Sequence, residues 1–389
     1  MTRVGVIGGG QLAWMMAGAA KDLGIELVVQ TPQSSDPAAA LASDVILAPI
    51  DDVAATQQLT VRCDRITFEN EFIDLEALRP LEQQGVCFRP RLDALAPLLD
   101  KYSQRQYLKS IGLPTPRFIA AETGDEWSAI LAELSRNQIA FPLVLKTRRH
   151  GYDGQGTFIL ADAEDLRATW EKLGHQPILL EEFVPFNREL AAIAARSASG
   201  EFVCYPIVET QQEDRVCRRV LAPANLDGKL VATIEANART LLETLDVVGL
   251  FGIEFFLTAA DTILVNEIAP RTHNSGHFSL DACHTSQFEQ LLRVVCDLPL
   301  GDASLFCDGA VMINLLGYEY SQSDYRDKRD KLASIPQAHL HWYGKTEARP
   351  GRKLGHITVL QQAHDELSLR DRALAIARQI EALWYGEED

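Results

Sequence analysis

The sequence has too little of several features to fit a number of large protein classes. Its seven cysteines are scattered and no C-x-x-C pair occurs, so neither a disulfide framework nor a zinc knuckle is indicated. Positive charge is scarce: the formal net charge is −17, whereas protein surfaces that bind nucleic acid are basic. No apolar run approaches the roughly 18 residues of a membrane span, and the chain starts with strand-like TRVGVIG rather than a signal peptide. We therefore expect a soluble, reduced, cytoplasmic protein that binds neither nucleic acid nor membranes.

The composition is otherwise that of an ordinary globular protein, with 389 residues, 47% hydrophobic and 23% charged, enough for two or three domains. The first 100 residues alternate short apolar strands with helical segments, which is typical of a parallel α/β sheet. In this part the sequence predicts a helix at Gln11–Leu23 and four strands, at Val4–Ile7, Glu26–Val29, Val45–Leu47 and Arg65–Phe68.

A clear break follows the charged amphipathic helix predicted at Asp100–Ile111, where Gly112 precedes LPTP. A second α/β stretch then runs from Phe118 to about Val184, and a β-rich section covers roughly 189–268. The further strands predicted are Leu143–Lys146, Thr157–Leu160, Ile178–Glu181 and Ala310–Leu315, and the further helices are Ser286–Cys296 and Ser368–Tyr385.

The most informative segment is FGIEFFLTAADTILVNEIAPRTHNSGH, from Phe251 to His277. Two apolar runs flank the polar turn TAADT, which predicts a β-hairpin. Glu254 and Glu267 lie in these runs, where an unpaired buried carboxylate would cost several kcal/mol or more. With the amide of Asn266 they form an oxygen-only set that suits Mg²⁺ or Mn²⁺, usually shared with nucleotide phosphates. Two half-exposed strand glutamates are the alternative.

A glycine turn follows the first strand, in VGVIGGGQLA, with Gly8, Gly10 and Ala13 at the spacing G-x-G-x-x-A. This is the context of a dinucleotide-binding fingerprint. The acidic ribose partner expected after the second strand is missing, because Gln30 and Thr31 stand there. The alternative is a tight turn that presents the helix N-terminus to another anion or polar ligand.

A second glycine loop, TRRHGYDGQGT, follows the strand that ends at Lys146 and precedes another strand. It is not a Walker P-loop, but a glycine flap over a lysine can cover phosphates; a surface hairpin is the alternative. Downstream, the strand ILLEE leads into apolar FVPF, as an adenine pocket would require. The backbone after Glu181 offers donors and acceptors for a purine edge, and Glu189 is in reach of a ribose diol.

Taken in this order, these elements resemble the ATP-grasp superfamily. More narrowly, the chain is similar to the biotin-independent carboxylases of purine biosynthesis, the N5-carboxyaminoimidazole ribonucleotide synthetases. The resemblance runs nearly end to end, and its most specific pieces are GGGQL, HGYDGQG, NEIAPRTHNSGH and HWYGKTEARPGRKLGH.

The resemblance implies an α/β and α+β fold of ATP-grasp architecture. An N-terminal parallel-sheet, Rossmann-like domain would cover residues 1–100. The ATP-grasp region, with its flap subdomain at about 115–182, would cover 101–300, and a C-terminal domain would cover 301–389.

The resemblance also implies which residues bind ATP and Mg²⁺ (or Mn²⁺), with no biotin. Glu254 and Glu267 would bind the metal. The nucleotide-binding residues would be Lys101, Lys146, Gly151, Tyr152, Asp153, Gly154, Gln155, Gly156, Thr157, Glu181, Glu182, Phe183, Val184, Glu189, Gln212, Asn266 and Glu267. Gln212 stands where a histidine near ATP is common in this family.

The acceptor and bicarbonate would lie beside Arg271 and the segment His273–His277. Residues expected to contact substrate are Gln11, Glu71, Tyr152, Asp153, Asn274, Ser275, His277, Lys345 and Arg352. Lys345 and Arg352 would hold the 5′-phosphate of aminoimidazole ribonucleotide. Their segment, KTEARPGRK, has four cations in nine residues; a solvated basic face is the alternative, but Arg grips phosphate bidentately.

The implied reaction converts ATP, bicarbonate and aminoimidazole ribonucleotide to ADP, phosphate and an N5-carbamate through carboxyphosphate, in a homodimer. Lys146, Asp153, Arg271 and His273 would act in catalysis, with Asp153 or His273 taking the amine proton. Three rivals are a different ATP-grasp ligase, such as a formate-dependent ribonucleotide formyltransferase or an amide-forming enzyme, a nicotinamide oxidoreductase, and a nucleotide-binding module without catalysis.

Overall fold

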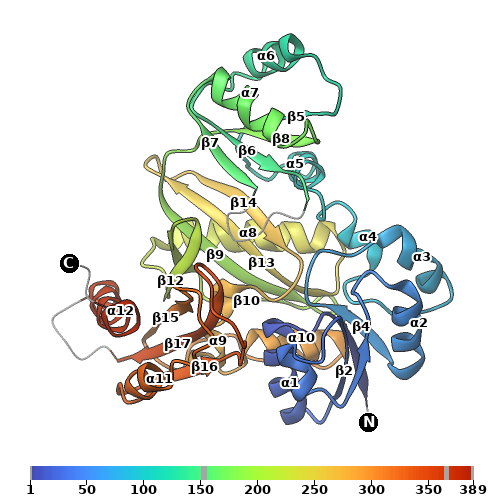
Figure 1. The fold of residues 1–389 in the computed structure, drawn as a ribbon, viewed down its shortest axis with the longest axis vertical. Coiled ribbons are helices and arrows are strands. Elements are labelled where there is room, and N and C mark those ends of the chain that lie inside the picture. Colours follow the sequence, from blue (N-terminus) through green and yellow to red (C-terminus); the bar gives the residue numbers. More distant parts are fainter. Residues whose placement is uncertain (1, 150–155, 363–367, 387–389) are drawn as a thin grey trace.

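The chain forms three β-sheets, as its computed structural model shows (Figure 1). The structure describes residues 2–149, 156–362 and 368–386. The predicted arrangement is confirmed: a parallel N-terminal sheet, a central region that includes a smaller antiparallel sheet, and a C-terminal part.

The N-terminal sheet has the strand order β3-β2-β1-β4, and its three strand pairs are parallel. It lies at the lower right of Figure 1, in blue. The elements up to residue 95 are β1 (Arg3–Ile7), α1 (Gln11–Asp22), β2 (Glu26–Thr31), η1 (Pro37–Ala40), β3 (Asp44–Leu47), α2 (Val53–Arg62), β4 (Arg65–Phe68), α3 (Leu75–Gln83) and α4 (Leu92–Leu95).

The glycine turn between β1 and α1 is closed by a side chain of the protein itself. The carboxylate of Glu69, just after β4, accepts hydrogen bonds from the amides of Gly10 (2.7 Å), Leu12 (3.0 Å) and Ala13 (3.3 Å). Parallel neighbours β1 and β4 end at the same sheet edge, which brings these groups together. The helix N-terminus therefore receives its anion from within, and these three amides are not free for a dinucleotide pyrophosphate.

The smaller central sheet is antiparallel, with the order β5-β8-β6-β7. It lies at the top of Figure 1, where α6 and α7 cover its outer face. This flap subdomain follows α5 (Lys101–Ser110), whose N-cap is Asp100. Its elements are β5 (Phe118–Ala121), α6 (Trp127–Arg136), β6 (Leu143–Thr147), β7 (Thr157–Leu160), α7 (Ala163–Lys172) and β8 (Ile178–Glu182).

The large sheet has nine strands, eight of them in the order β14-β13-β9-β11-β12-β15-β17-β16, with β10 beside β9. Strands from the central region and from the C-terminal part thus form one continuous hydrogen-bonded surface. Its strands are β9 (Phe186–Arg196), β10 (Phe202–Cys204), β11 (Val208–Glu213), β12 (Val216–Ala222), β13 (Gly249–Thr258), β14 (Ile263–Ala269), β15 (Gly309–Leu316), β16 (Ala338–Trp342) and β17 (Lys353–Gln361).

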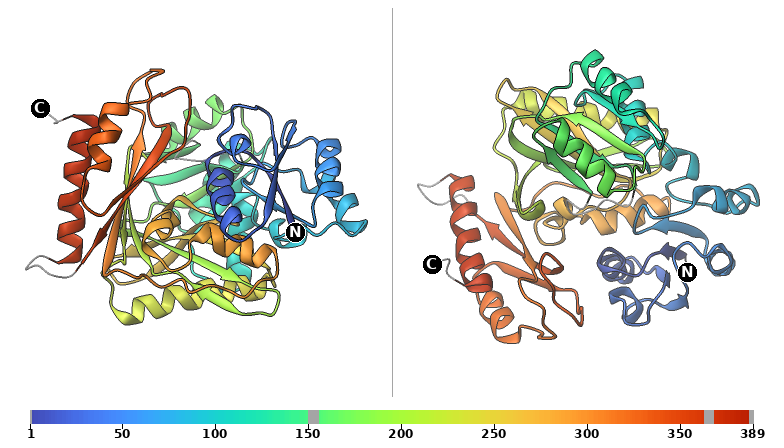
Figure 2. Two further views of the ribbon diagram at one scale, coloured as in Figure 1. Left: turned by 90° about the horizontal axis from the view of Figure 1, so that it is seen from below. Right: turned by 45° about the horizontal axis from the view of Figure 1, so that its top comes forward.

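Helices cover both ends of this sheet. At the C-terminal end, α12 packs on β15 and buries Trp384 fully, and the indole donates a 2.8 Å hydrogen bond to the carbonyl of Leu316. The two views of Figure 2 show α11 and α12 beside the C-terminal strands, away from the N-terminal sheet. The remaining helices are α8 (Gly228–Thr244), η2 (Asn274–Gly276), α9 (Ser279–Ala282), α10 (Gln287–Val295), α11 (Arg326–Ala333) and α12 (Leu369–Tyr385). Among the described helices, none is both long enough and apolar enough to cross a membrane.

The glycine turn gives a stability prediction. Gly8 has φ +124°, and a Cβ there would lie 2.5 Å from the Cβ of Glu69, whereas a Cβ on Gly18 in α1 meets nothing within 4 Å. Gly8→Ala should destabilise the fold by about 2 kcal/mol or more, lowering the thermal unfolding midpoint by about 2–3 °C or more in a chain of 389 residues. Gly18→Ala should raise the midpoint slightly, because alanine has a higher helix propensity than glycine. Equal midpoints for the two variants would contradict this account of the turn.

Candidate functional site

A cleft of about 1880 Å³ opens where the three sheets meet. Most of the residues predicted from sequence line it. They are Gln11, Glu71, Lys101, Lys146, Thr157, Glu181, Glu182, Phe183, Val184, Glu189, Gln212, Glu254, Asn266, Glu267, Arg271, His273, Asn274, Lys345 and Arg352. Five predicted residues, Gly151, Tyr152, Asp153, Gly154 and Gln155, lie outside the described part of the chain. Gly156, at the end of the loop, has φ +79° and accepts a 2.8 Å backbone hydrogen bond from Thr147.

The floor of the cleft is the predicted hairpin of β13 and β14. Glu254 pairs with Glu267 and Phe255 with Val265, so Asn266 is an extra residue in a β-bulge. Without a bulge, neighbouring residues would point to opposite faces of the sheet. The bulge lets Asn266 and Glu267 both line the cleft beside Glu254, and the amide nitrogen of Asn266 is 3.4 Å from a Glu254 oxygen.

Three charged side chains meet in the wall between α5, β6 and β8. Lys146 is 7% exposed, and its Nζ lies 2.7 Å from Glu181 Oε2 and 3.1 Å from Asn266 Oδ1. Arg105 pairs with the other oxygen of Glu181 and also donates to the backbone carbonyl of Asn266. Burial alone would raise the pKa of Glu181, but Arg105 and Lys146 outweigh it and lower that pKa to about 2. Burial lowers the pKa of Lys146, and Glu181 opposes this.

A second lysine lies directly on the hairpin. Lys101 Nζ is 2.5 Å from Glu267 Oε1, and this contact holds the pKa of Glu267 below its ordinary value against the opposing effect of burial. Glu254 has a weaker partner, His273, whose Nε2 is 3.5 Å away. Burial, with Glu267 and then Glu189, raises the pKa of Glu254 to about 7. A divalent cation between the two carboxylates would relieve their mutual repulsion.

The predicted adenine and ribose region lies at the end of β8. Glu182 Oε2 accepts a hydrogen bond from Arg117 Nε at 2.7 Å, and Phe183 is 39% exposed. Burial raises the pKa of Glu189 to about 7, and its Oε1 accepts from Gln212 Nε2 at 3.2 Å. Glu189 and Gln212 therefore form a polar pair with an acceptor and a donor in the cleft.

The opposite end of the cleft joins the N-terminal sheet to the C-terminal strands. Arg271 Nη2 is 2.8 Å from Glu71 Oε1. Lys345 Nζ donates to Gln11 Oε1 at 2.8 Å. Arg352 donates to the carbonyl of Glu347 at 2.7 Å, which holds the guanidinium over the turn that precedes β17. Arg271, Lys345 and Arg352 thus line the cleft through contacts with the N-terminal and C-terminal parts of the chain.

The segment that follows β14 is only partly exposed to the cleft. Asn274 lines it and exchanges two side-chain hydrogen bonds with Asn314, at 2.9 and 2.7 Å. Ser275 is 1% exposed and His277 is 0% exposed, and neither lines the cleft. The structure therefore does not bring these two side chains to the cleft, and their contact with substrate remains a prediction. Ser275 instead accepts or donates a 2.8 Å hydrogen bond with His273 Nδ1 and so orients that ring.

Two residues of the site were not singled out from the sequence. Arg105 was not recognised, although it lies four residues after Lys101 and therefore on the same face of α5. Glu69 was not assigned a role either, although the parallel pairing of β1 and β4 would have placed it at the glycine turn. In both, the signal is a charged residue at a position that the local structure buries: Glu69 is 8% exposed and Arg105 is 2% exposed.

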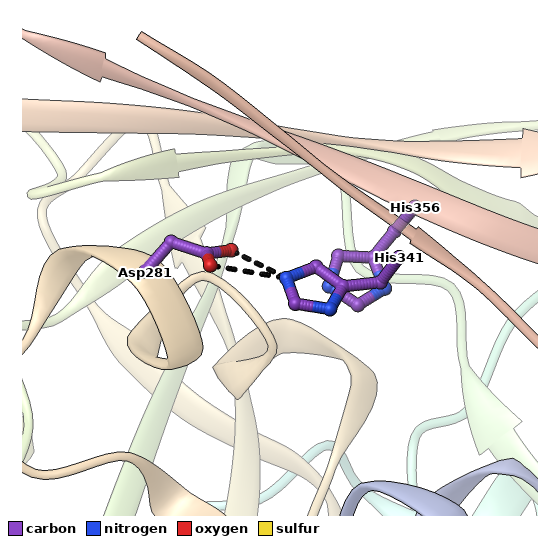
Figure 3. A group of neighbouring side chains, drawn as sticks. All are labelled: Asp281, His341 and His356. Carbon is purple, nitrogen blue, oxygen red and sulfur yellow. Dashed lines mark hydrogen bonds and ion pairs between the residues drawn. The ribbon is translucent and has the colours of Figure 1, made fainter. Parts of the chain in front are cut away.

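A separate group of potential metal ligands, Asp281, His341 and His356, lies on α9, β16 and β17 (Figure 3). His341 Nε2 already lies 2.9 Å from Asp281, and His356 Nδ1 lies 2.8 Å from the hydroxyl of Tyr343. The two imidazole rings are stacked, with centroids 4.6 Å apart and planes 15° apart. Because nitrogen lone pairs lie in the ring planes, stacked rings do not point them at one ion. The group fastens α9 to the C-terminal strands.

The cleft suits a magnesium–nucleotide complex. Glu254, Asn266 and Glu267 supply only oxygen donors, which fits Mg²⁺ or Mn²⁺. Lys101 and Lys146 lie beside them and provide the positive charge that polyphosphate requires.

Comparison with protein families accounts for nearly the whole chain. Residues 1–97 match the ribonucleotide synthetase preATP-grasp domain, and residues 106–288 match the ATP-grasp domain. Residues 310–370 match the phosphoribosylaminoimidazole carboxylase C-terminal domain.

Individual relatives match this chain over nearly its full length. The chain is 54% identical over 381 residues to N5-carboxyaminoimidazole ribonucleotide synthase of Synechococcus elongatus, covering 98% of this chain and 95% of that protein. It is similar to an N5-carboxyaminoimidazole ribonucleotide synthetase solved with ADP, at TM-score 0.89 and 34% identity, covering 100% and 98%. It is also similar to the Aspergillus clavatus synthase solved with ADP and aminoimidazole ribonucleotide, at TM-score 0.85 and 30% identity, covering 97% and 99%. With all three segments matched and relatives this similar end to end, the chain belongs to the N5-carboxyaminoimidazole ribonucleotide synthase family of ATP-grasp ligases.

Proposed function

We propose that the cleft of this ATP-dependent ligase phosphorylates bicarbonate with ATP and transfers the carboxyl group to aminoimidazole ribonucleotide, giving N5-carboxyaminoimidazole ribonucleotide for purine biosynthesis. The observation that carries the proposal is a single cleft with two ends. One end holds the oxygen ligands and lysines that Mg–ATP needs. The other holds the cations of Arg271, Lys345 and Arg352, which suit an anion and a ribonucleotide phosphate.

The first step transfers the γ-phosphoryl group to a bicarbonate oxygen and forms carboxyphosphate. Such a transfer depends on charge neutralisation and alignment more than on covalent chemistry. Lys146 and Lys101 supply the protein's share of positive charge at the phosphates. Lys101 now pairs with Glu267 and must move from that carboxylate to reach a phosphate oxygen. Glu254 and Glu267, with Asn266, would hold Mg²⁺, which neutralises phosphate charge when it is bound.

The second step places the exocyclic amine of the ribonucleotide next to the activated carboxyl group. Lys345 and Arg352 bind the 5′-phosphate, and Arg271, held by Glu71, lies beside the reacting groups. The amine attacks the carboxyl carbon, or CO₂ released from carboxyphosphate, and inorganic phosphate leaves. His273 is oriented by Ser275 and takes the amine proton, with Asp153 as the other candidate. Carboxyphosphate is unstable in water, so the site must exclude solvent during the reaction; the glycine loop predicted to do so lies largely outside the described residues. The homodimer and the cytoplasmic location expected above also remain proposals.

The direct test measures ADP release with Mg–ATP and bicarbonate, with and without aminoimidazole ribonucleotide. A parallel reaction contains formate and glycinamide ribonucleotide. We expect strong stimulation by aminoimidazole ribonucleotide, together with bicarbonate-derived label in an acid-labile product. Stimulation by the formate pair alone would move the function to the formyltransferase rival, and no stimulation in either reaction would overturn the proposal.

Loss of one metal carboxylate should stop the chemistry. Glu267→Gln removes a charge from the oxygen set and should reduce ATP turnover by about 100-fold or more, with an unchanged far-ultraviolet circular dichroism spectrum. Asp261→Asn is the matched control: it removes a carboxylate from the exposed turn of the same hairpin, at φ +57°, a conformation that asparagine tolerates. Near-normal turnover in Glu267→Gln would refute the metal assignment.

Substitutions at the proposed ribonucleotide-phosphate site should weaken ribonucleotide binding without weakening ATP binding. Lys345→Ala combined with Arg352→Ala should raise the KM for aminoimidazole ribonucleotide about tenfold or more, because each charge-assisted hydrogen bond contributes about 1.5–3 kcal/mol. The KM for ATP should stay within about twofold. Arg326→Ala combined with Lys331→Ala removes the same charge from the exposed face of α11 and serves as the control. An unchanged ribonucleotide KM in the first variant would rule out the phosphate pocket.

A further inference from the structure

Arg105 closes a ring of polar contacts beneath the cleft. It contacts the Glu181 carboxylate, whose other oxygen pairs with Lys146. Lys146 in turn donates to the side chain of Asn266, and the backbone carbonyl of Asn266 accepts from Arg105. The four members come from α5, β8, β6 and β14, so one guanidinium connects the helix, the flap sheet and the large sheet.

The charges in this ring do not cancel. Arg105 and Lys146 are cations and Glu181 is their one carboxylate, so the ion-paired triad carries a net charge of +1. The side chains of Arg105, Glu181 and Lys146 are 2%, 3% and 9% exposed. Lys146 and Glu181 line the cleft, whereas Arg105 does not. With Arg105 compensating the buried carboxylate, the ammonium of Lys146 retains attraction for an incoming anion. Without Arg105, Glu181 would neutralise Lys146 directly.

A neighbouring contact fixes the geometry. Gln104, 3% exposed, exchanges two hydrogen bonds with the backbone of Ile268, at 3.1 and 3.0 Å. Together with the bond from Arg105 to Asn266, it joins α5 to β14 on both sides of Glu267. The same helix also carries Lys101, the partner of Glu267. Helix α5 therefore sets both the charge and the place of the groups around the phosphate site.

We propose that Arg105 is a positioning residue that keeps Lys146 available to the nucleotide phosphates by compensating Glu181. This inference rests on the proposed assignment of Lys146 to those phosphates. It gives the buried Arg105–Glu181 pair a role in substrate binding in addition to its role in holding the sheets together.

The test is a double-mutant cycle at Arg105 and Glu181. The measured quantity is the affinity of the full chain for β,γ-imido-ATP in the presence of Mg²⁺, determined by isothermal titration calorimetry. Arg105→Gln should weaken binding about tenfold or more, since Lys146 then pairs with an uncompensated Glu181. Arg105→Gln combined with Glu181→Gln should recover most of that loss, because Lys146 again carries an unpaired charge. Arg105→Lys should bind nearly as the wild type does. Because removal of both partners of a buried ion pair can also restore stability, thermal unfolding midpoints are measured alongside, and weaker binding by Arg105→Gln at a midpoint equal to that of the double variant is the result that a purely structural role would not give.

Two further variants separate the possible failures. Arg196→Gln is the matched control, because Arg196 also joins a carboxylate (Asp246, 3.0 Å) and a backbone carbonyl (Val247, 3.0 Å), away from the cleft. It should bind the analogue normally.

Lys146→Gln should weaken binding; if it does not, the assignment of Lys146 to the nucleotide phosphates itself fails. If Lys146→Gln weakens binding but Arg105→Gln does not, or if the double variant binds no better than Arg105→Gln, the positioning role is overturned. Should Arg105→Gln fail to fold, the double variant still decides: binding as weak as that of Lys146→Gln would overturn the positioning role, and binding closer to that of the wild type would support it.

Discussion

The structure depends on how it compensates Glu181, a carboxylate buried where three sheets meet. A charge in that position is tolerable only with partners close by, and here they come from α5 and β6. Each partner has a second contact as well: Arg105 donates to the backbone carbonyl of Asn266 in the β13–β14 hairpin, and Lys146 donates to the side-chain amide oxygen of the same residue. The same ion pairs that make burial possible therefore hold the flap sheet against the large sheet and orient a cation toward the cleft.

Around this centre, local irregularities in regular elements create the site. The β-bulge at Asn266 brings consecutive polar residues to one face, which a regular strand does not allow. The turn after β1 takes its anion from Glu69, so the N-terminal domain presents Gln11 rather than a dinucleotide site to the cleft. Because β15, β16 and β17 continue the central sheet, Lys345 and Arg352 are carried to the same cleft from the far end of the chain. The two ends of the cleft are thus fixed by one framework.

Much of this was accessible from the sequence. The alternation of strands and helices predicted the parallel N-terminal sheet, and the hairpin around Glu254 and Glu267 is present with its turn where expected. The resemblance to the synthetase family located the lysines and the cationic segment near ATP and acceptor, and the cleft contains those that the structure describes. The partners of these charged side chains could not be predicted from the sequence, because the residues in contact lie far apart in the chain. Examples are Arg105 with Glu181, Arg271 with Glu71 and Lys345 with Gln11. The burial of His277 was missed for a related reason: its motif suggested a substrate contact, but Gln287 on α10 covers it.

The central claim is that ATP activates bicarbonate itself. It is tested most directly by supplying bicarbonate labelled with ¹⁸O at all three oxygens and analysing the inorganic phosphate by mass spectrometry after a single turnover with aminoimidazole ribonucleotide. Phosphoryl transfer to a bicarbonate oxygen, followed by loss of phosphate to the amine, predicts one ¹⁸O in each phosphate released and two in the carbamate. Phosphate without ¹⁸O would mean that ATP is cleaved by water or that another substrate is phosphorylated, and the account of this cleft would be wrong.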